Sequence, residues 1–389
     1  MKKLRRVVVM IDLNFTVVHH HQIFAGIQRY AQECGKWACS VNQYPELLLR
    51  GRRRDAVIDG IVGRIPAHLA DVARQAKVPV VNVWLNSPAK GLPSVVSDAA
   101  EAGRMAARHL LARGFRKFAY LGYTNSRGSK LQLEGFREVL SAMKYPCSVC
   151  QTAISFAKTV SKWQKFQFKI NKWINGWTTP IGVYAGHDVL CRYLAEACKE
   201  RGLKVPLEVA LIGSFNEKVV CDHPEPSLSS VDFGFERIGY QAAALLDRLM
   251  DGKQAPREPI RVVPTELVPR QSSDAFAVDD PMVSKALRFI AENPHKAIDV
   301  AEVAAHVSVA RRTLLRAFKK SLGRTVHDAI TYLRVERVKR FLMETGEPLK
   351  TVAAACGFTD AIHLCKVFQR IEGSSPSDYR AARMVQHRT

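Results

Sequence analysis

The stretch VAEVAAHVSVARRTLLRAFKKSLG, residues 300–323, has the pattern of a short helix, a turn and a longer helix. Asp299 before it is placed as the N-cap of the short helix, because a glutamate follows three residues later at the spacing of a capping box. In the longer helix, predicted over 311–321, Leu314 and Phe318 lie four residues apart and therefore share one side. The stretch predicts a helix-turn-helix with an apolar inner side and basic outer faces.

The same unit occurs again between residues 349 and 373. A short apolar helix is followed by a turn at Gly357 and by a second helix over 360–371, whose apolar residues again recur at helical spacing. One long helix, predicted over 328–344, joins the two units. Residues 282–389 are therefore predicted to form an all-α domain with two helix-turn-helix units in tandem.

The charge of the chain favours a polyanionic partner. Lys and Arg number 58 against 36 Asp and Glu, which gives a net charge of +22. The 107 residues after Met282 carry a net charge of +9 and the first 282 carry +13, so the tail is nearly twice as basic per residue. Cationic side chains bind nucleic acid by releasing counterions, and a helix fits the major groove of DNA. Double-stranded DNA is the predicted partner, and the alternative is a helical bundle with solvated basic faces.

Strands and helices alternate over the first 269 residues, which predicts βαβ units and parallel sheets covered by helices. The predicted strands are 7–13, 59–65, 78–85, 117–123, 181–186, 209–215 and 260–268. The predicted helices are 22–35, 66–76, 99–114, 131–143, 188–202 and 235–252. This length exceeds one doubly wound sheet, so two α/β lobes with a cleft between them are expected.

Residues 270–281 are polar and rich in turn formers, which is the composition of an interdomain linker.

No apolar run approaches the roughly 18 residues of a membrane span, and the run after the basic N-terminus is too short for a signal peptide. A cytoplasmic protein without a membrane partner is therefore expected. The nine cysteines show no zinc-type spacing, so neither a metal nor a cofactor is expected, and Cys147 and Cys150 are interpreted as buried thiols.

Several motifs of the tail recur at fixed spacings: RRTLLRAF at 311–318, RVERV at 334–338, CGF at 356–358 and Pro376 followed by Tyr379-Arg380. Together they resemble the DNA-binding domain of the AraC family of transcription regulators. The resemblance implies that the second helix of each unit contacts bases, through Arg311, Arg312, Arg316, Lys319, His363 and Lys366. Two positions depart from the family pattern. Ser308 stands in place of a turn glycine and Ala310 in place of a capping serine, so the start of the first recognition helix is expected to be less stable.

The α/β region also carries motifs, namely SDAAEAG at 97–103, EGF at 134–136, VALIG at 209–213 and LSSV at 228–231. They resemble the periplasmic-binding-protein-like sensor of LacI-type repressors. The fold class is thus a two-lobed periplasmic-binding-protein-like α/β sensor domain, 1–269, followed by the tandem helix-turn-helix domain. This order resembles a group of bacterial regulators that bind a pentose and activate sugar-catabolic genes. The resemblance implies a small sugar-like effector, a homodimer and contact with RNA polymerase.

The polar groups expected of a sugar site are incomplete. Sugar pockets need carboxylates and amides that pair with hydroxyls. Phe215 replaces an expected Asp, and Gln132 replaces an expected Arg. Either the pocket accepts another ligand, such as a less polar or differently hydroxylated sugar, so that xylose binds weakly or not at all, or effector sensing has been lost. The candidate effector residues are Asn14, Arg127, Asp188 and Asn216, and Asp188 has the alternative role of capping a helix start.

Two further features have simple interpretations. The triplet His19-His20-His21 is interpreted as a surface loop and not as a metal site, because three adjacent residues cannot share one helix face. The basic and aromatic stretch 158–177 is interpreted as a sensor helix that buries Phe166, Ile170 and Trp173 and exposes its lysines; the alternative is a second nucleic-acid surface. The tandem helix-turn-helix is positive evidence for DNA binding, and no nucleophile elbow, P-loop or HExxH pattern occurs, so the chain is predicted to be a transcription regulator and not an enzyme. The alternative function is a sugar-binding or sugar-processing protein whose helical tail does not read DNA.

Overall fold

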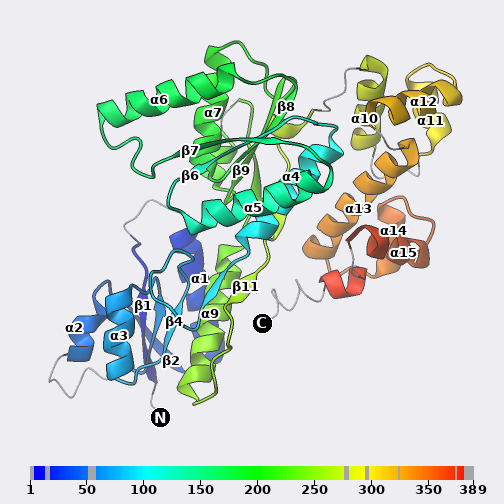
Figure 1. Ribbon diagram of the computed structural model, residues 1–389. Helices are drawn as coiled ribbons and strands as arrows, with labels where there is room; N and C mark the ends of the chain where they lie inside the picture. The colour runs from blue at the N-terminus through cyan, green and yellow to red at the C-terminus, as the bar shows by residue number, and fades with distance from the viewer. Residues whose placement is uncertain are drawn as a thin grey trace.

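Two mainly parallel sheets, each covered by helices, form the two lobes of the first 268 residues (Figure 1). The computed structural model describes residues 4–13, 18–50, 58–223, 225–275, 280–293, 298–322, 325–372 and 375–380. Asn14 lies outside these residues, so its predicted role is not described by the structure. Among the helices of the described ranges, none has the length and apolar character needed to cross a membrane.

The first lobe has a four-stranded parallel sheet with the order β2-β1-β3-β4. Its strands are β1 (Arg5–Met10), β2 (Trp37–Val41), β3 (Gly60–Gly63) and β4 (Val80–Asn82). Its helices are α1 (Val18–Cys34), α2 (Pro45–Arg50), α3 (Ala67–Gln75) and, much later in the chain, α9 (Phe235–Met250). The strands β3 and β4 are buried throughout and β1 is buried at its centre, because helices cover both faces there, whereas the edge strand β2 is mostly exposed.

The second lobe has a six-stranded sheet with the order β12-β10-β9-β8-β6-β7, in which only β12 runs antiparallel to its neighbour. Its strands are β6 (Phe118–Tyr123), β7 (Cys147–Thr152), β8 (Ile181–Ala185), β9 (Val209–Ser214), β10 (Ser229–Asp232) and β12 (Glu266–Val268). Its helices are α4 (Ala99–Ala112), α5 (Arg127–Ala142), α6 (Val160–Asn175), α7 (Asp188–Glu200) and the short α8 (Lys218–Cys221).

The chain passes between the lobes three times. It enters the second lobe through β5 (Val95–Ser97), returns to the first between β10 and α9, and leaves again after β11 (Ile260–Val262). The strands β5 and β11 pair in parallel as a separate two-stranded sheet. The strand predicted over 260–268 is therefore wrong as one element, because β11 and β12 belong to two different sheets.

Glycines bring one helix pair of each lobe close together. A Cβ on Gly239 of α9 would collide with the backbone of Ile23 in α1, and a Cβ on Gly135 of α5 would collide with the backbone of Ala100 in α4. Gly135, which belongs to one of the motifs that carry the family resemblance, thus has a packing role. Larger residues at the two glycines would force both helix pairs apart.

The strands β2, β5, β7 and β10 are missing from the predicted set. The prediction for 158–177 is confirmed, because Phe166 and Ile170 are buried in α6 and Trp173 packs against the same core. The surface-loop interpretation of the histidine triplet is wrong. His19 and His20 lie in the first turns of α1 and are largely or fully buried, and only His21 is exposed.

The predicted linker starts against the sensor. Residues Gln271–Ser273 form a 3-10 turn in which Ser272 is fully buried and donates from Oγ to the Leu211 carbonyl at 2.7 Å. The first helix of the tail is α10 (Pro281–Glu292), with Asp280 as its N-cap. The first residues of the predicted linker therefore belong to the sensor. Their polar side chains form hydrogen bonds with the sensor backbone.

The tail is all helical, as predicted, and it lies along one side of the sensor (Figure 1). After α10 its helices are α11 (Val300–His306), α12 (Arg311–Leu322), α13 (Val326–Glu344), α14 (Leu349–Ala355) and α15 (Ala361–Glu372), and residues 376–380 are helical as well. Each unit has its own apolar core. The first core includes Ile330 and has Leu333 packed against it, and the second begins at Val335, so α13 contributes to both. Arg116 of the sensor donates to the Leu322 carbonyl at the end of α12, at 2.9 Å.

Candidate functional site

The outer face of α12 is cationic and exposed. Leu314 and Phe318 are fully buried, while four of the predicted DNA contacts are exposed on the same helix: Arg311, Arg312, Arg316 and Lys319. The sequence of α12 contains no acidic residue. Its arginines can therefore reach phosphates or the guanine edge, on which a guanidinium forms two hydrogen bonds.

The corresponding helix of the second unit, α15, presents a different surface. Lys366 is exposed, whereas His363 is half-buried and is oriented by its neighbours. Its backbone N–H donates to Asp360 Oδ1 at 2.7 Å, and its Nδ1 lies 3.0 Å from Thr359 Oγ1. Ile362 is 69% exposed on the outer side of α15 and was not among the predicted residues. An apolar side chain on a DNA-facing helix suits the methyl group of thymine.

The two helix-turn-helix units differ in how their second helices begin and in the residue at the turn. The capping box at Asp299 is confirmed, since its Oδ1 accepts from the Glu302 N–H and the Glu302 carboxylate accepts from the Asp299 N–H. Asp360 caps the start of α15, and this hydrogen bonding lowers the pKa of its carboxyl. Ala310 stands at the equivalent position before α12 and can offer only its backbone carbonyl. Ser308 adopts φ +58°, so a residue with a side chain occupies a left-handed turn.

Aromatic rings from both sensor lobes form a cluster around Phe215. The Phe215 ring lies 4.9 Å from His187, 4.9 Å from Phe233, 5.5 Å from Phe235 and 5.6 Å from His19, measured between ring centroids. These rings come from both lobes, because His19 and Phe235 start helices of the first and His187 precedes α7 of the second. The residue that replaces the expected Asp thus sits at the centre of an apolar cluster.

The two histidines of this cluster are held neutral. Burial lowers the pKa of His19 to about 3 and the pKa of His187 to about 4. The Nδ1 atom of His187 accepts from the Val189 N–H at 3.2 Å. The Nδ1 atom of His19 is buried and has no hydrogen-bond partner among the described residues. A buried polar atom without a partner costs about 1–3 kcal/mol, so this atom is suited to bind a ligand hydroxyl.

Asp188 serves the fold of the second lobe. It is fully buried as the first residue of α7, and its two oxygens accept from Ser230 Oγ at 2.6 Å and from the Glu217 N–H at 2.8 Å. Burial raises the pKa of its carboxyl to about 7, and the hydrogen bonds partly offset that effect. The alternative role as a helix cap is wrong, because His187 is the N-cap of α7 and both Asp188 oxygens bond residues outside that helix.

Asn216 is linked to Asp188 through Ser230 and also bonds residues that Asp188 does not contact. Its backbone N–H donates to Ser230 Oγ at 3.0 Å, its Nδ2 donates to Asp232 at 3.0 Å, and its Oδ1 accepts from Arg270 at 2.8 Å. Both Phe215 and Asn216 have positive φ, +98° and +54°. A phenylalanine in this region is strained, and such strain concentrates at binding sites.

Arg127 is separate from both residues. It is exposed at the start of α5 and lines a cavity that none of the aromatic rings around Phe215 reaches. The structure therefore places Asp188 and Asn216 in one region, joined by Ser230, and Arg127 in another. Within the described ranges, His, Cys, Asp and Glu side chains form no group of three or more that could hold a metal ion.

Comparison with protein families divides the chain in the same way. Residues 107–273 match the periplasmic binding protein-like domain, and residues 22–151 match the periplasmic binding proteins and sugar binding domain of the LacI family. Residues 303–382 match the helix-turn-helix domain. The last match covers both units of the tail, including α12 and α15.

The chain is similar over nearly its full length to known regulators. It is 27% identical over 391 residues to the xylose operon regulatory protein of Escherichia coli, covering 97% of each chain. It is 28% identical to the protein of the same name from Haemophilus influenzae, covering 74% of each. A solved xylose-binding transcription activator superposes with a TM-score of 0.60 at 24% identity, covering 98% of this chain and all of the other.

The similarity extends through the tail, so the alternative in which the helical tail does not read DNA is not supported. The chain is a DNA-binding transcription regulator, in which a periplasmic-binding-protein-like sensor precedes an AraC-type pair of helix-turn-helix units.

Proposed function

We propose that this protein activates sugar-catabolic genes when a small effector, less polar than a pentose, enters the cleft between its sensor lobes. The observation that carries this proposal is the ring cluster around Phe215, which joins the two lobes in a chain whose tail is built to bind DNA. Relatives of full length are named for the xylose operon, which supports a sugar as the ligand class.

The cleft lining supports a ligand with an apolar face. Aromatic rings stack on the C–H face of a sugar, and His19 Nδ1 is available for one hydroxyl. The carboxylate that would pair with two adjacent hydroxyls is absent at position 215. A deoxysugar or an aryl glycoside satisfies this lining better than xylose does.

The mode of action follows from the architecture. A ligand that binds one arrangement of the lobes more tightly than the other shifts the population towards it. In a homodimer this shift would change the spacing of two DNA-binding tails, and contact with RNA polymerase would then give activation. A function in DNA binding also supports the cytoplasm as the location of the protein.

The first experiment identifies the operator by selection from random duplexes with the full chain. Binding to the selected site is then measured by fluorescence anisotropy, with pentoses, hexoses, deoxysugars and aryl glycosides added in turn. We expect a steep decrease of affinity with salt, because several phosphates are contacted, and a change of affinity with one of the less polar sugars. Failure to enrich any sequence would contradict the proposal, and so would a response to xylose alone.

A further inference from the structure

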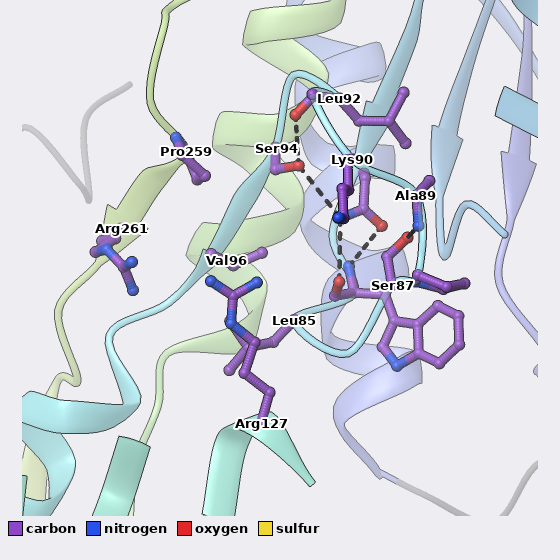
Figure 2. Close-up of a pocket in the computed structure, with 14 residues that line it drawn as sticks. Leu85, Ser87, Ala89, Lys90, Leu92, Ser94, Val96, Arg127, Pro259 and Arg261 are labelled. Atoms are coloured by element: carbon purple, nitrogen blue, oxygen red, sulfur yellow. Dashed lines mark hydrogen bonds between the residues drawn. The ribbon is translucent and has the colours of Figure 1, made fainter. Parts of the chain in front are cut away.

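A cavity of about 340 Å³ lies beside the strands that connect the lobes, and both lobes contribute to its lining (Figure 2). Trp84 and Lys90 belong to the loop between β4 and β5, Arg127 begins α5, and Arg261 lies on β11. None of the rings around Phe215 lines this cavity. Its volume is near the lower end of the roughly 300–1,000 Å³ of small-molecule sites, so it suits a compact ligand.

The charge of the lining is one-sided. Of the fourteen residues that line the cavity, Lys90, Arg127 and Arg261 are cationic and none is acidic. Among the residues that the structure describes, no carboxylate forms an ion pair with any of the three. Figure 2 shows the guanidinium groups of Arg127 and Arg261 turned towards one another. A bound anion would be attracted by all three cationic side chains.

The start of α5 adds to the positive potential. Ser126 caps the helix by accepting from the Ser129 N–H, and the first turn contains no acidic residue. The dipole of a 16-residue helix therefore points its positive end at this side of the cavity. The Arg127 N–H donates to Asn86 Oδ1 at 2.7 Å, which fixes the helix start against the β4–β5 loop.

We propose that this cavity is a second effector site, which binds the phosphate group of a small phosphorylated polyol. A guanidinium forms two parallel hydrogen bonds with a phosphate, and two converging guanidinium groups neutralise a dianion. The uncharged part of the ligand would lie against the Trp84 ring and near Ser94. The residues of this site are separate from the aromatic cluster around Phe215.

A ligand in this site would contact both lobes. Arg127 belongs to the second lobe, and Lys90 belongs to a loop of the first. A dianion held by both residues strengthens the contact that Arg127 already makes with Asn86. Binding therefore stabilises the arrangement in which the lobes are close, and it modifies the response to the effector of the cleft.

The test is isothermal titration calorimetry on the full chain with glycerol 3-phosphate, ribose 5-phosphate and glucose 6-phosphate. Parallel titrations use ribose, glucose and inorganic phosphate. We expect at least one ester to bind, and we expect its affinity to fall at least tenfold in Arg127→Gln and in Arg261→Gln. Inorganic phosphate binds at least tenfold more weakly than that ester, and the unphosphorylated sugars leave the site empty. Arg248→Gln removes an exposed arginine of α9, outside the cavity, and leaves the affinity unchanged.

Four outcomes would overturn the proposal. The first is that none of the three esters binds, and the second is that both arginine variants bind the ester as tightly as the unmodified chain. The third is that inorganic phosphate binds as tightly as the best ester. The fourth is that the arginine variants lose affinity for DNA when no ester is present. The last outcome would assign the arginines to the DNA backbone. The melting temperature of each ligand-free variant shows whether it has folded, and Lys90→Gln, in an exposed loop, gives a second test.

Discussion

Ser308 and Gly357 occupy the same position in the two helix-turn-helix units, and both have a left-handed backbone, with φ of +58° and +74°. A side chain in this conformation costs about 1–2 kcal/mol, and glycine avoids that cost. We expect Ser308→Gly to raise the free energy of unfolding of the first unit by about 1 kcal/mol. Hydrogen exchange of the α11 and α12 amides in the full chain measures the change. Gly357→Ala is the matched control, and it should destabilise the second unit; faster exchange in Ser308→Gly would refute the assignment of strain.

Arg316 is exposed on α12, four residues after Arg312. If it forms two hydrogen bonds with a guanine, its loss removes about 1–3 kcal/mol of discrimination at one base pair. We expect Arg316→Ala to abolish the preference for the selected site while binding to random DNA remains largely intact. Anisotropy titrations on both duplexes measure the effect, with Arg248→Ala as the control. Equal losses on the two duplexes would instead make Arg316 a phosphate contact.

Ile362 lies four residues before Lys366 on the exposed side of α15. Contact with a thymine methyl predicts that Ile362→Ala weakens specific binding several-fold, with a loss confined to one A·T pair of the site. Substituting uracil for that thymine in the duplex should abolish the difference between the two proteins. A uniform loss over all sequences would mean that Ile362 has no role in readout.

Phe215 has φ +98° and stands where a carboxylate was expected. Asp tolerates positive φ better than Phe, so Phe215→Asp relieves strain and supplies acceptors for paired hydroxyls. We expect the variant to bind pentoses more tightly, while the unmodified chain binds xylose weakly or not at all. Calorimetry with xylose, ribose and arabinose measures this difference. Tight binding of xylose by the unmodified chain would show that position 215 does not control the ligand.

The neutral histidines of the cleft make stability depend on pH. His19 and His187 bind protons in the unfolded chain below about pH 6.5, but in the folded chain only near pH 3 and pH 4. Between pH 6.5 and 4 the unfolded state therefore holds more of these protons, and the free energy of unfolding falls as the pH falls. Asp188 opposes this trend with one proton, because its pKa is raised to about 7 in the folded chain.

His19→Phe keeps a ring in the cluster and removes one of the titrating groups. We expect the slope of the unfolding free energy between pH 6 and 4.5 to decrease by about 1.4 kcal/mol per pH unit, the value for one proton. Urea denaturation at several pH values measures the slope. His21→Phe changes the exposed neighbour and serves as the control. An unchanged slope in His19→Phe would place its ring in solvent.

The sequence predicted those parts of the chain in which local pattern and structure agree. The helices of the tail carry apolar residues at helical spacing, such as Leu314 and Phe318, and both are fully buried. Asp299 was found because a capping box is a local motif. Strands of three or four residues, such as Val95–Ser97, are too short for any periodicity, and only their pairing with distant strands defines them.

The sites were harder to predict, because side chains converge from distant segments. Arg127 and Arg261 are 134 positions apart in the sequence, and only the crossing strands bring them to one cavity. His19 looked like part of a polar surface triplet, but its burial depends on Phe235 more than 200 residues later. Asp188 matched a family position, yet its hydrogen bonds to Ser230 and Glu217 lie outside any local motif.

The division of α13 between two cores determines the relative orientation of the two recognition helices. Leu333 packs with the first unit and Val335 with the second, so Arg334 alone separates the two sets of contacts. An α-helix rotates by about 100° and rises by about 1.5 Å with each residue. One alanine inserted after Arg334 would leave each core able to form, yet it would turn α15 by that angle about the axis of α13. The two units could then no longer face one side of straight DNA together. The number of residues of α13 between the two cores would therefore limit which operator spacings the protein recognises.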